Sequence, residues 1–223
     1  MNYTPPMTAR SAASRLIEVA IEQFGQNGLS AVGTRAIAEA AGMQMSAITY
    51  HFGGKEGLYL ACARHIAQQM NERIAPVLEL AESTSADPVG TTGARAAILS
   101  IVGGFVTVMM RDDVAPLARF MVREQMNPTP AFEILYEGTM RRVLTLLGDL
   151  LQRVAGGALG TEEIRIRSLA LMGQVFVFRF CRAALMRTTE WESVGAWEAE
   201  AVRTAVLAHS EAILIALEKG AHP

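Results

Sequence analysis

The sequence predicts an all-α protein of about nine helices, with an N-terminal three-helix domain and a larger helical domain after it. Apolar residues recur three and four positions apart through most of the chain, and no segment alternates polar and apolar residues as a half-buried strand does. Residues that cap or break helices fall between these apolar segments. The chain has 223 residues, of which 51% are hydrophobic, and is therefore long and apolar enough to bury a core.

The first predicted helix runs from about Thr8 to Gln26. Leu16, Ala20 and Phe24 lie four residues apart on one line of this helix. Such an apolar line on an otherwise polar helix indicates a face that packs on neighbouring helices.

Two short helices joined by a glycine turn are predicted next. The first begins with Thr34 as its N-cap and ends at Gly42, which supplies the backbone freedom that a tight exit requires. The second runs from about Gln44 to Phe52 and turns Ala47 and Ile48 inward. This is the outline of a helix-turn-helix, whose second helix fits the major groove of DNA.

The helices of the larger domain are separated by proline, glycine and polar segments. The first of them starts near Lys55 and is expected to end or kink at Pro76, and the polar segment from Glu82 to Gly93 is the expected loop. The further predicted helices are Arg95 to Met110, Asp113 to Met126, Ala131 to Val154, Glu162 to Arg187 and Ala196 to Lys219.

Two segments resemble a known family. The run from Tyr50 to Leu58, YHFGGKEGL, is similar to the exit of the recognition helix in TetR-family transcriptional repressors, and Phe24, Gly25 and Gly28 fall at that family's spacing. The segment from Arg123 to Tyr136, REQMNPTPAFEILY, resembles the regulatory domain of the CecR-like branch. The resemblance implies a helix-turn-helix DNA-binding domain over residues 1–56 and a ligand-binding and dimerisation domain over residues 57–223.

The predicted recognition helix has no Arg or Lys between Met43 and Phe52, so it offers no bidentate grip on guanine. Gln44 suits adenine, the Met45 side chain and the Thr49 methyl group suit a thymine methyl, and Ser46 offers a polar atom outward. The resemblance adds contacts to the DNA backbone, at Thr34, Tyr50, His51 and Lys55. The alternative for each side chain is that it packs against the protein or faces solvent.

A ligand cavity in the larger domain is expected to be lined by adaptable apolar side chains and two polar groups. The candidates are Phe105, Met109, Phe120, Met121, Gln125, Phe176 and Arg179. On a helical wheel Gln125 falls near the middle of an apolar face, opposite Arg119 and Arg123, and would need a partner there. A core glutamine already bonded within the protein is the alternative for Gln125, and a structural ion pair is the alternative for Arg179.

Apolar residues cover the whole circumference of the chain from Leu169 to Cys181, which indicates a helix with core on one side and a second subunit on the other. The expected dimer interface adds small residues of the last helix, which permit close helix approach. Its members are Phe180, Ala201, Ala205, Ala208 and Ala212. A two-fold dimer suits a near-palindromic DNA operator.

The net charge of −2 gives no general sign of nucleic-acid binding. The sequence has no nucleophile and base pair, metal motif or phosphate-binding loop, so no enzyme activity, cofactor or metal is expected. Cys62 and Cys181 are expected to be reduced and buried. No signal peptide and no apolar run long enough for a membrane helix are expected, which favours the cytoplasm.

The leading hypothesis is therefore a ligand-responsive transcriptional regulator, a homodimeric repressor that a small-molecule effector releases from double-stranded DNA. The resemblance to the CecR-like branch suggests an aromatic or drug-like effector. A helical adaptor that binds protein instead of DNA is the alternative, and a helical enzyme is a third.

Overall fold

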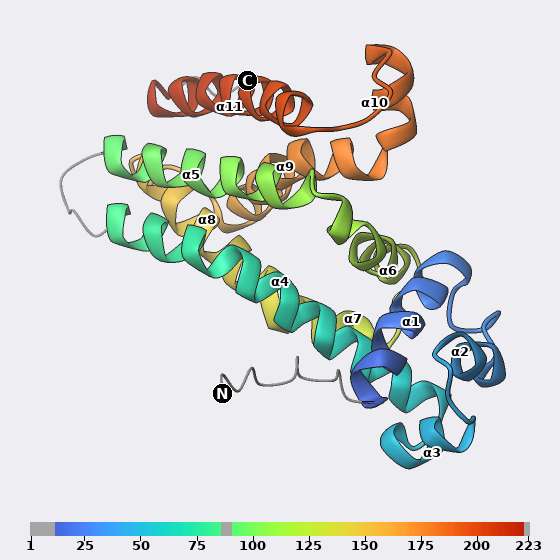
Figure 1. The fold of residues 1–223 in the computed structure, drawn as a ribbon. Helices are drawn as coiled ribbons and strands as arrows, with labels where there is room; N and C mark the ends of the chain where they lie inside the picture. The colour runs from blue at the N-terminus through green and yellow to red at the C-terminus, as the bar shows by residue number, and fades with distance from the viewer. Residues whose placement is uncertain (1–11, 86–90, 221–223) are drawn as a thin grey trace, which may run out of the picture. The chain divides into compact units, whose positions relative to one another are not determined.

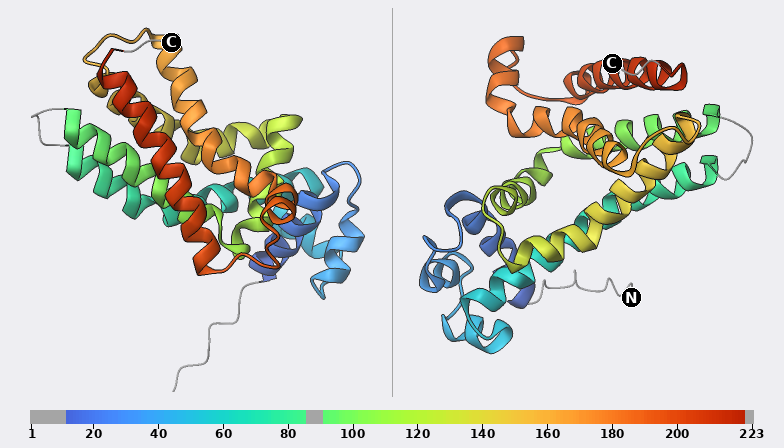
Figure 2. Two further views of the ribbon diagram at one scale, coloured as in Figure 1. Left: turned by 90° about the horizontal axis from the view of Figure 1, so that it is seen from above. Right: turned by 180° about the vertical axis from the view of Figure 1, so that it is seen from behind.

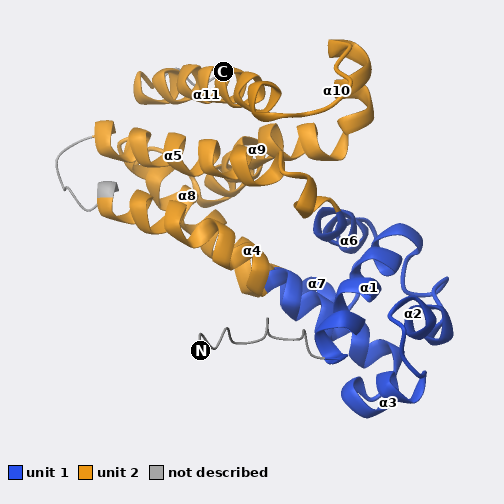
Figure 3. Cartoon of the chain, viewed as in Figure 1, with its two compact units in different colours: residues 1–67, 116–135 blue, residues 68–115, 136–223 orange. Residues whose placement is uncertain are grey.

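The computed structural model describes residues 12–85 and 91–220. These residues form eleven α-helices, a 3-10 turn and a π-helical stretch, with no strand among them, which confirms the all-α prediction (Figure 1). The chain divides into two compact units (Figure 3). Unit 1 is Met1–Ala67, described from Ala12 onward, together with Pro116–Leu135, and unit 2 is Gln68–Ala115 together with Tyr136–Pro223. Unit 1 is thus discontinuous in sequence.

Unit 1 contains the helix-turn-helix and two helices from the middle of the chain. Its elements are α1 (Ala12–Asn27), α2 (Thr34–Ala40), α3 (Ser46–Phe52), the start of α4 (Lys55–Ser85), α6 (Ala115–Met126) and α7 (Pro130–Leu135). Leu16, Ala20 and Phe24 are fully buried, which confirms the predicted apolar line of α1. The ring of Phe24 lies 4.9 Å from that of Tyr59 in α4, and the Tyr59 ring lies 4.6 Å from Phe120 in α6. This aromatic cluster joins α1, α4 and α6 in one core.

Unit 2 is a helical bundle around α5. It holds the rest of α4, then α5 (Thr91–Met109), the 3-10 turn η1 (Asp112–Val114), the π-helical η2 (Tyr136–Met140), α8 (Arg141–Val154), α9 (Thr161–Phe180), α10 (Arg182–Thr189) and α11 (Ala196–Glu218). Helix α5 packs against α8, α9 and α11, as the two further views also show (Figure 2). By length and mean hydropathy alone α5 could cross a membrane, but more than half of it is buried within the protein, which is typical of a core helix.

Of the two outcomes expected at Pro76, an end or a kink, the first does not occur: helix α4 continues to Ser85. Proline inside a helix costs roughly 3 kcal/mol. Ile74 and Leu78, on either side of it, are fully or almost fully buried, and burying one such side chain stabilises by about 1.5–3 kcal/mol. Pro76 itself is exposed. The burial of Ile74 and Leu78 is large enough to offset the cost of the proline and its missing hydrogen bond.

The predicted helix from Glu162 to Arg187 is in fact two helices. The chain bends by 72° between α9 and α10, with Cys181 between them at φ −99° and ψ 32°. Just after the bend Arg182 Nη2 donates to Asp112 Oδ1 at 3.0 Å. No glycine or proline marks the bend in the sequence, so helical periodicity alone could not locate it.

Candidate nucleic-acid interface

Helix α3 exposes one polar face and buries a single residue, Ile48. Tyr50 has 85% of its surface exposed and Met45, at the N-cap, has 56%. The other predicted contact residues on and before this helix are also exposed, namely Gln44, Ser46, Thr49 and His51. Ala47, expected to turn inward, is half-buried. The face is free of positive charge, so it can offer donors, acceptors and methyl groups to base edges but no cation.

The turn between α2 and α3 has the conformation that the sequence predicts. Gly42 has φ +66°, in the left-handed region that side chains disfavour, which confirms its expected role. Its amide donates to the Glu39 carbonyl oxygen at 3.0 Å, and the Met43 amide donates to Ala38 at 2.8 Å. Arg15 of α1 donates from Nη2 to the Ala41 carbonyl oxygen at 2.6 Å and so covers the end of α2.

Thr34 is the first residue of α2, whereas the sequence predicted it as the N-cap. The N-cap is Gly33, whose extended backbone carries no side-chain cap, and whose carbonyl oxygen accepts from the Ile37 amide at 3.3 Å. Helix starts are commonly displaced by one residue in this way. Thr34 remains at the amino end of α2, where unpaired amides favour an anion.

The junction between α3 and α4 explains why a glycine stands at position 57. A Cβ atom on Gly57 would lie 1.8 Å from the Phe52 carbonyl oxygen and 2.9 Å from its carbonyl carbon. No side chain fits there without moving the end of α3. The YHFGGKEGL segment therefore fixes the angle between α3 and the first turn of α4.

Lys55 opens α4 and is held against the loop between α1 and α2. Its Nζ donates to the Ser30 carbonyl oxygen at 3.4 Å, and its side chain is half-buried. Because an ammonium group has three donors, one such bond leaves two for a phosphate. Arg35 is less available, since its Nε pairs with Glu39 at 2.8 Å on the exposed side of α2.

The buried polar residue of α6 is Glu124. The helical-wheel prediction that placed Gln125 in the middle of the apolar face is therefore wrong. Glu124 is 1% exposed, whereas Gln125 is exposed. The Tyr59 hydroxyl donates to Glu124 Oε1 at 2.6 Å, and burial together with this bond raises the pKa of Tyr59. The face of α6 that enters the core is centred on Phe120 and Glu124, one turn apart, because α6 packs on α1 and α4.

The seven predicted ligand residues are divided between the two units. Phe105 and Met109 of α5 and Arg179 of α9 are buried in unit 2, where Phe176 lies with its ring 6.4 Å from that of Phe105. Phe120, Met121 and Gln125 belong to unit 1, and Phe120 is part of its aromatic core. The ligand assignment stays a prediction, and the surroundings of Phe120 favour a structural role for that residue.

The predicted dimer residues lie on an exposed face of unit 2. Phe180 is 49% exposed, Ala201 is half-buried, and the three later alanines of α11, Ala205, Ala208 and Ala212, are exposed. The same two helices expose further apolar residues that the prediction did not name individually, namely Ile166, Leu169 and Val177 of α9 and Trp197 of α11. Periodicity could not separate the exposed from the buried side of α9 after Leu169, because apolar residues surround the helix there. Such an apolar face is typical of a surface that a partner covers.

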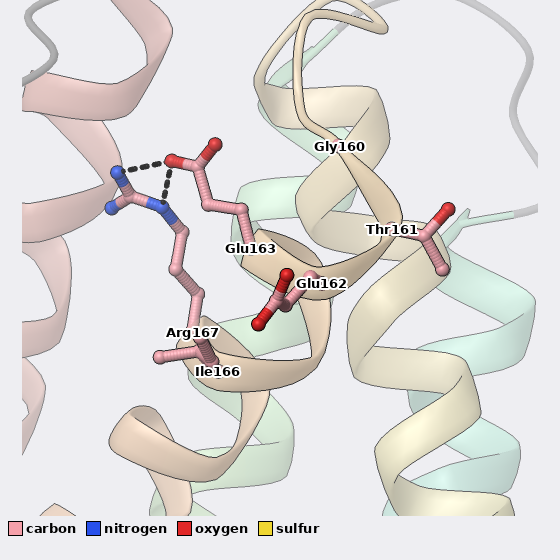
Figure 4. A pocket seen from close by; sticks show the side chains of 6 residues that line it. All are labelled: Gly160, Thr161, Glu162, Glu163, Ile166 and Arg167. Atoms are coloured by element: carbon pink, nitrogen blue, oxygen red, sulfur yellow. Dashed lines mark hydrogen bonds and ion pairs between the residues drawn. The ribbon is translucent and has the colours of Figure 1, made fainter.

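A hollow of about 630 Å³ lies at the start of α9 (Figure 4). The side chains of Glu163 and Arg167 reach toward each other along its edge, with Arg167 Nε 2.8 Å from Glu163 Oε1. A second hollow of about 280 Å³ lies in unit 1, beside the loop between α1 and α2 and the end of α6. Neither hollow is lined by a predicted ligand residue.

The two cysteines differ in their surroundings. Cys62 is buried as predicted, and burial raises the pKa of its thiol. Cys181 is exposed, so the prediction that both are buried is wrong for this residue, which lies at the bend between α9 and α10. Within residues 12–85 and 91–220, no three His, Cys, Asp or Glu side chains are grouped to hold a metal ion.

Two protein-family models match this chain. Residues 16–62 match the model of the bacterial regulatory proteins of the tetR family, and residues 94–217 match the C-terminal domain of the HTH-type transcriptional dual regulator CecR. The chain is 33% identical to the HTH-type transcriptional dual regulator CecR of Shigella flexneri over 218 residues, which cover 96% of this chain and 97% of that protein.

One further relative and one solved structure are also similar to this chain. The HTH-type transcriptional regulatory protein RaaS of Mycobacterium tuberculosis is 44% identical over 75 residues, 34% of this chain and 35% of that protein. The structure of AibR in complex with isovaleryl coenzyme A and operator DNA has a TM-score of 0.65 at 11% identity, and the match covers 89% of this chain and 97% of AibR. At that identity the likeness shows the fold alone.

Proposed function

Because this chain belongs to the TetR family of bacterial regulators and carries the CecR-type C-terminal domain, we propose that it is a homodimeric transcriptional repressor, released from its operator by a small-molecule effector. The observation that carries the proposal is helix α3, whose exposed polar face follows a glycine turn inside a family-matched helix-turn-helix. This face is the part of the chain that would enter the major groove.

We assign the DNA contacts to two groups. Gln44, Met45, Ser46 and Thr49 would meet base edges, because they are exposed and uncharged and include an amide and methyl groups. Thr34, Tyr50, His51 and Lys55 would hold the phosphates on either side. With a single cation among these eight side chains, shape and neutral hydrogen bonds contribute much of the specificity.

The exposed apolar face of α9 and α11 supports a two-fold dimer. Phe180, Ala205, Ala208 and Ala212 would lie in the interface, with Ala201 at its edge. A two-fold pair presents two copies of α3 to a near-palindromic operator, so the proposed dimer and the proposed DNA site require each other.

The effector would act by preferring the form of the dimer that does not bind DNA. Linkage then requires operator DNA to weaken effector binding by the same factor. AibR was solved with both isovaleryl coenzyme A and operator DNA. The buried Phe105 and Met109 of unit 2, with the half-buried Phe176 and with Arg179, suit an aromatic or drug-like compound with an acidic group. We place the protein in the cytoplasm and assign it no enzymatic activity.

Selection of bound duplexes from a random DNA pool, using the full-length chain, tests the proposal directly. We expect one near-palindromic sequence, with binding that weakens steeply as salt rises. Gln44→Ala should loosen the preference at one position of each half-site, while Glu18→Ala, an exposed change on α1, should leave the selected sequence unaltered. Recovery of no common sequence, or binding indifferent to salt, would reject DNA recognition and favour the adaptor hypothesis.

A further inference from the structure

Helix α6 is seated directly on α1 at a glycine. A Cβ atom on Gly25 would lie 3.2 Å from the Pro116 carbonyl oxygen and 3.3 Å from both Arg119 Cβ and the Phe120 amide nitrogen. These distances are tighter than ordinary contacts, so a larger residue would push the first turn of α6 away from α1. The Phe-Gly pair of the N-terminal motif therefore accommodates a helix that lies about ninety residues later in sequence.

The end of α6 is fixed by a buried carboxylate. Glu124 Oε1 accepts from the Tyr59 hydroxyl at 2.6 Å, and its Oε2 accepts from the Thr129 amide at 3.0 Å and the Thr129 hydroxyl at 2.9 Å. Three donors on a carboxylate that is 1% exposed satisfy most of its acceptor sites. This network holds α4, α6 and the start of α7 in one arrangement.

Arg123, the residue before this carboxylate, covers the end of α1. Its Nε donates to the Gly25 carbonyl oxygen at 2.8 Å and its Nη2 donates to the Gln26 carbonyl oxygen. The last carbonyls of a helix have no partner within the helix, and a guanidinium presents several donors in a fixed fork. Arg123 thus fixes the point at which the chain leaves α1 and enters the loop of residues 28–33.

The same loop supports the proposed phosphate contact. Four residues beyond Gln26, the Ser30 carbonyl oxygen accepts from Lys55 Nζ at 3.4 Å, and the loop then leads into Thr34 at the start of α2. Arg123 and Lys55 therefore donate to carbonyl oxygens of one short segment, residues 25–30, although 68 positions separate them in the sequence.

We infer that Arg123 is a positioning residue for DNA binding: it holds the loop between α1 and α2 so that Ser30 aims the Lys55 ammonium, and α6 is accordingly part of the DNA-binding machinery. The inference rests on the proposed function, since it assigns a supporting role to a residue beyond the predicted contacts. Arg123 is the first residue of the segment that resembles the CecR-like regulatory domain. The inference assigns it instead to the support of the DNA contacts.

The test uses the full-length chain and one duplex recovered by the selection described above, and titrates binding at several salt concentrations. Arg123→Ala should weaken binding about tenfold, because loss of the charge-assisted hydrogen bonds at the end of α1 releases the loop that aims Lys55 at the phosphate. It should also lower the slope of log affinity against log salt by between about 1 and 1.8, as expected when the Lys55 contact fails in both protomers. Lys55→Ala should lower the slope equally, and adding Arg123→Ala to it should cost less than about twofold more.

Arg119→Ala is the matched control. Arg119 lies one turn earlier on α6 and pairs with Glu22 at 2.6 Å, but both side chains are about two-fifths exposed, and such pairs contribute little. It should change operator affinity less than about twofold. Arg123→Lys keeps the charge and loses the fork, so it should fall between wild type and Arg123→Ala even if the alanine variant folds poorly.

The outcomes separate the two claims. Weaker binding with an unchanged salt slope for both Arg123 variants, or a full additional loss in the Lys55→Ala background, would overturn the positioning role. Failure of the wild-type chain to bind the selected duplex better than a duplex of random sequence would instead overturn the proposed function.

Discussion

Truncation of Phe120 tests whether α6 belongs to the core of unit 1 or lines an effector cavity. The ring is fully buried and lies 4.6 Å from Tyr59, which in turn contacts Phe24. Removing such a ring costs about 3–5 kcal/mol, because transfer energy and packing are both lost. A ring that lined an open cavity would already lack contacts on one side and would cost much less.

Phe120→Ala should therefore lower the free energy of unfolding by about 3–5 kcal/mol, a large share of the roughly 5–15 kcal/mol that folded domains have. The assay is urea denaturation followed by circular dichroism, at one fixed protein concentration because a dimer makes stability depend on concentration. Met126→Ala on the same helix is the control. Its side chain is 75% exposed, and we expect a change within about 0.5 kcal/mol. A loss below about 1.5 kcal/mol for Phe120→Ala, or one equal to the control, would refute the assignment.

Three further predictions follow from other parts of the chain. Gly57→Ala places a Cβ atom 1.8 Å from a backbone oxygen of α3, so we expect a loss of about 2 kcal/mol or more and at least tenfold weaker operator binding; near-normal stability in a denaturant titration would contradict the contact. Hydrogen bonds from Arg111 and then Arg73 lower the pKa of Asp113 to about 2, from an ordinary 3.8, so its stabilisation is present above pH 3.8 and lost as the pH falls toward 2. The difference in melting temperature between wild type and Asp113→Asn should shrink over that interval, and a constant difference would disagree. A thiol reagent should label Cys181 rapidly in the native chain and Cys62 only on unfolding, and two fast reactions would argue against the burial of Cys62.

Local chemistry predicted the N-terminal helices closely. Gly42 was identified because few other residues tolerate its backbone conformation, and the line through Leu16, Ala20 and Phe24 was identified because one amphipathic helix can bury only one face. Thr34 was displaced from its predicted place by one position, since a glycine before it can serve as the N-cap without a side chain. These features depend on neighbours within a few residues, which the sequence displays directly.

Features that depend on distant partners were not predictable in this way. Glu124 and Gln125 are adjacent and both polar, and the packing of α6 on α1 and α4, with the Tyr59 hydroxyl bonded to Glu124, decides which of them is buried. The bend at Cys181 and the passage of α4 through Pro76 likewise result from packing. The role inferred for Arg123 needs the end of α1 and the end of α6 in contact, which no periodicity reveals.

The discontinuity of unit 1 has a consequence for chimeric regulators. Exchanging the first sixty or so residues between relatives is a natural way to give one effector domain a new operator. In this chain such a graft would separate Gly25 from Pro116 and the end of α1 from Arg123. The transplanted N-terminal segment would keep its own α3 but would pack on the α6 of the recipient protein. A hybrid built from this protein should therefore carry residues 116–135 along with its N-terminus, or have the α1 and α6 surfaces redesigned together.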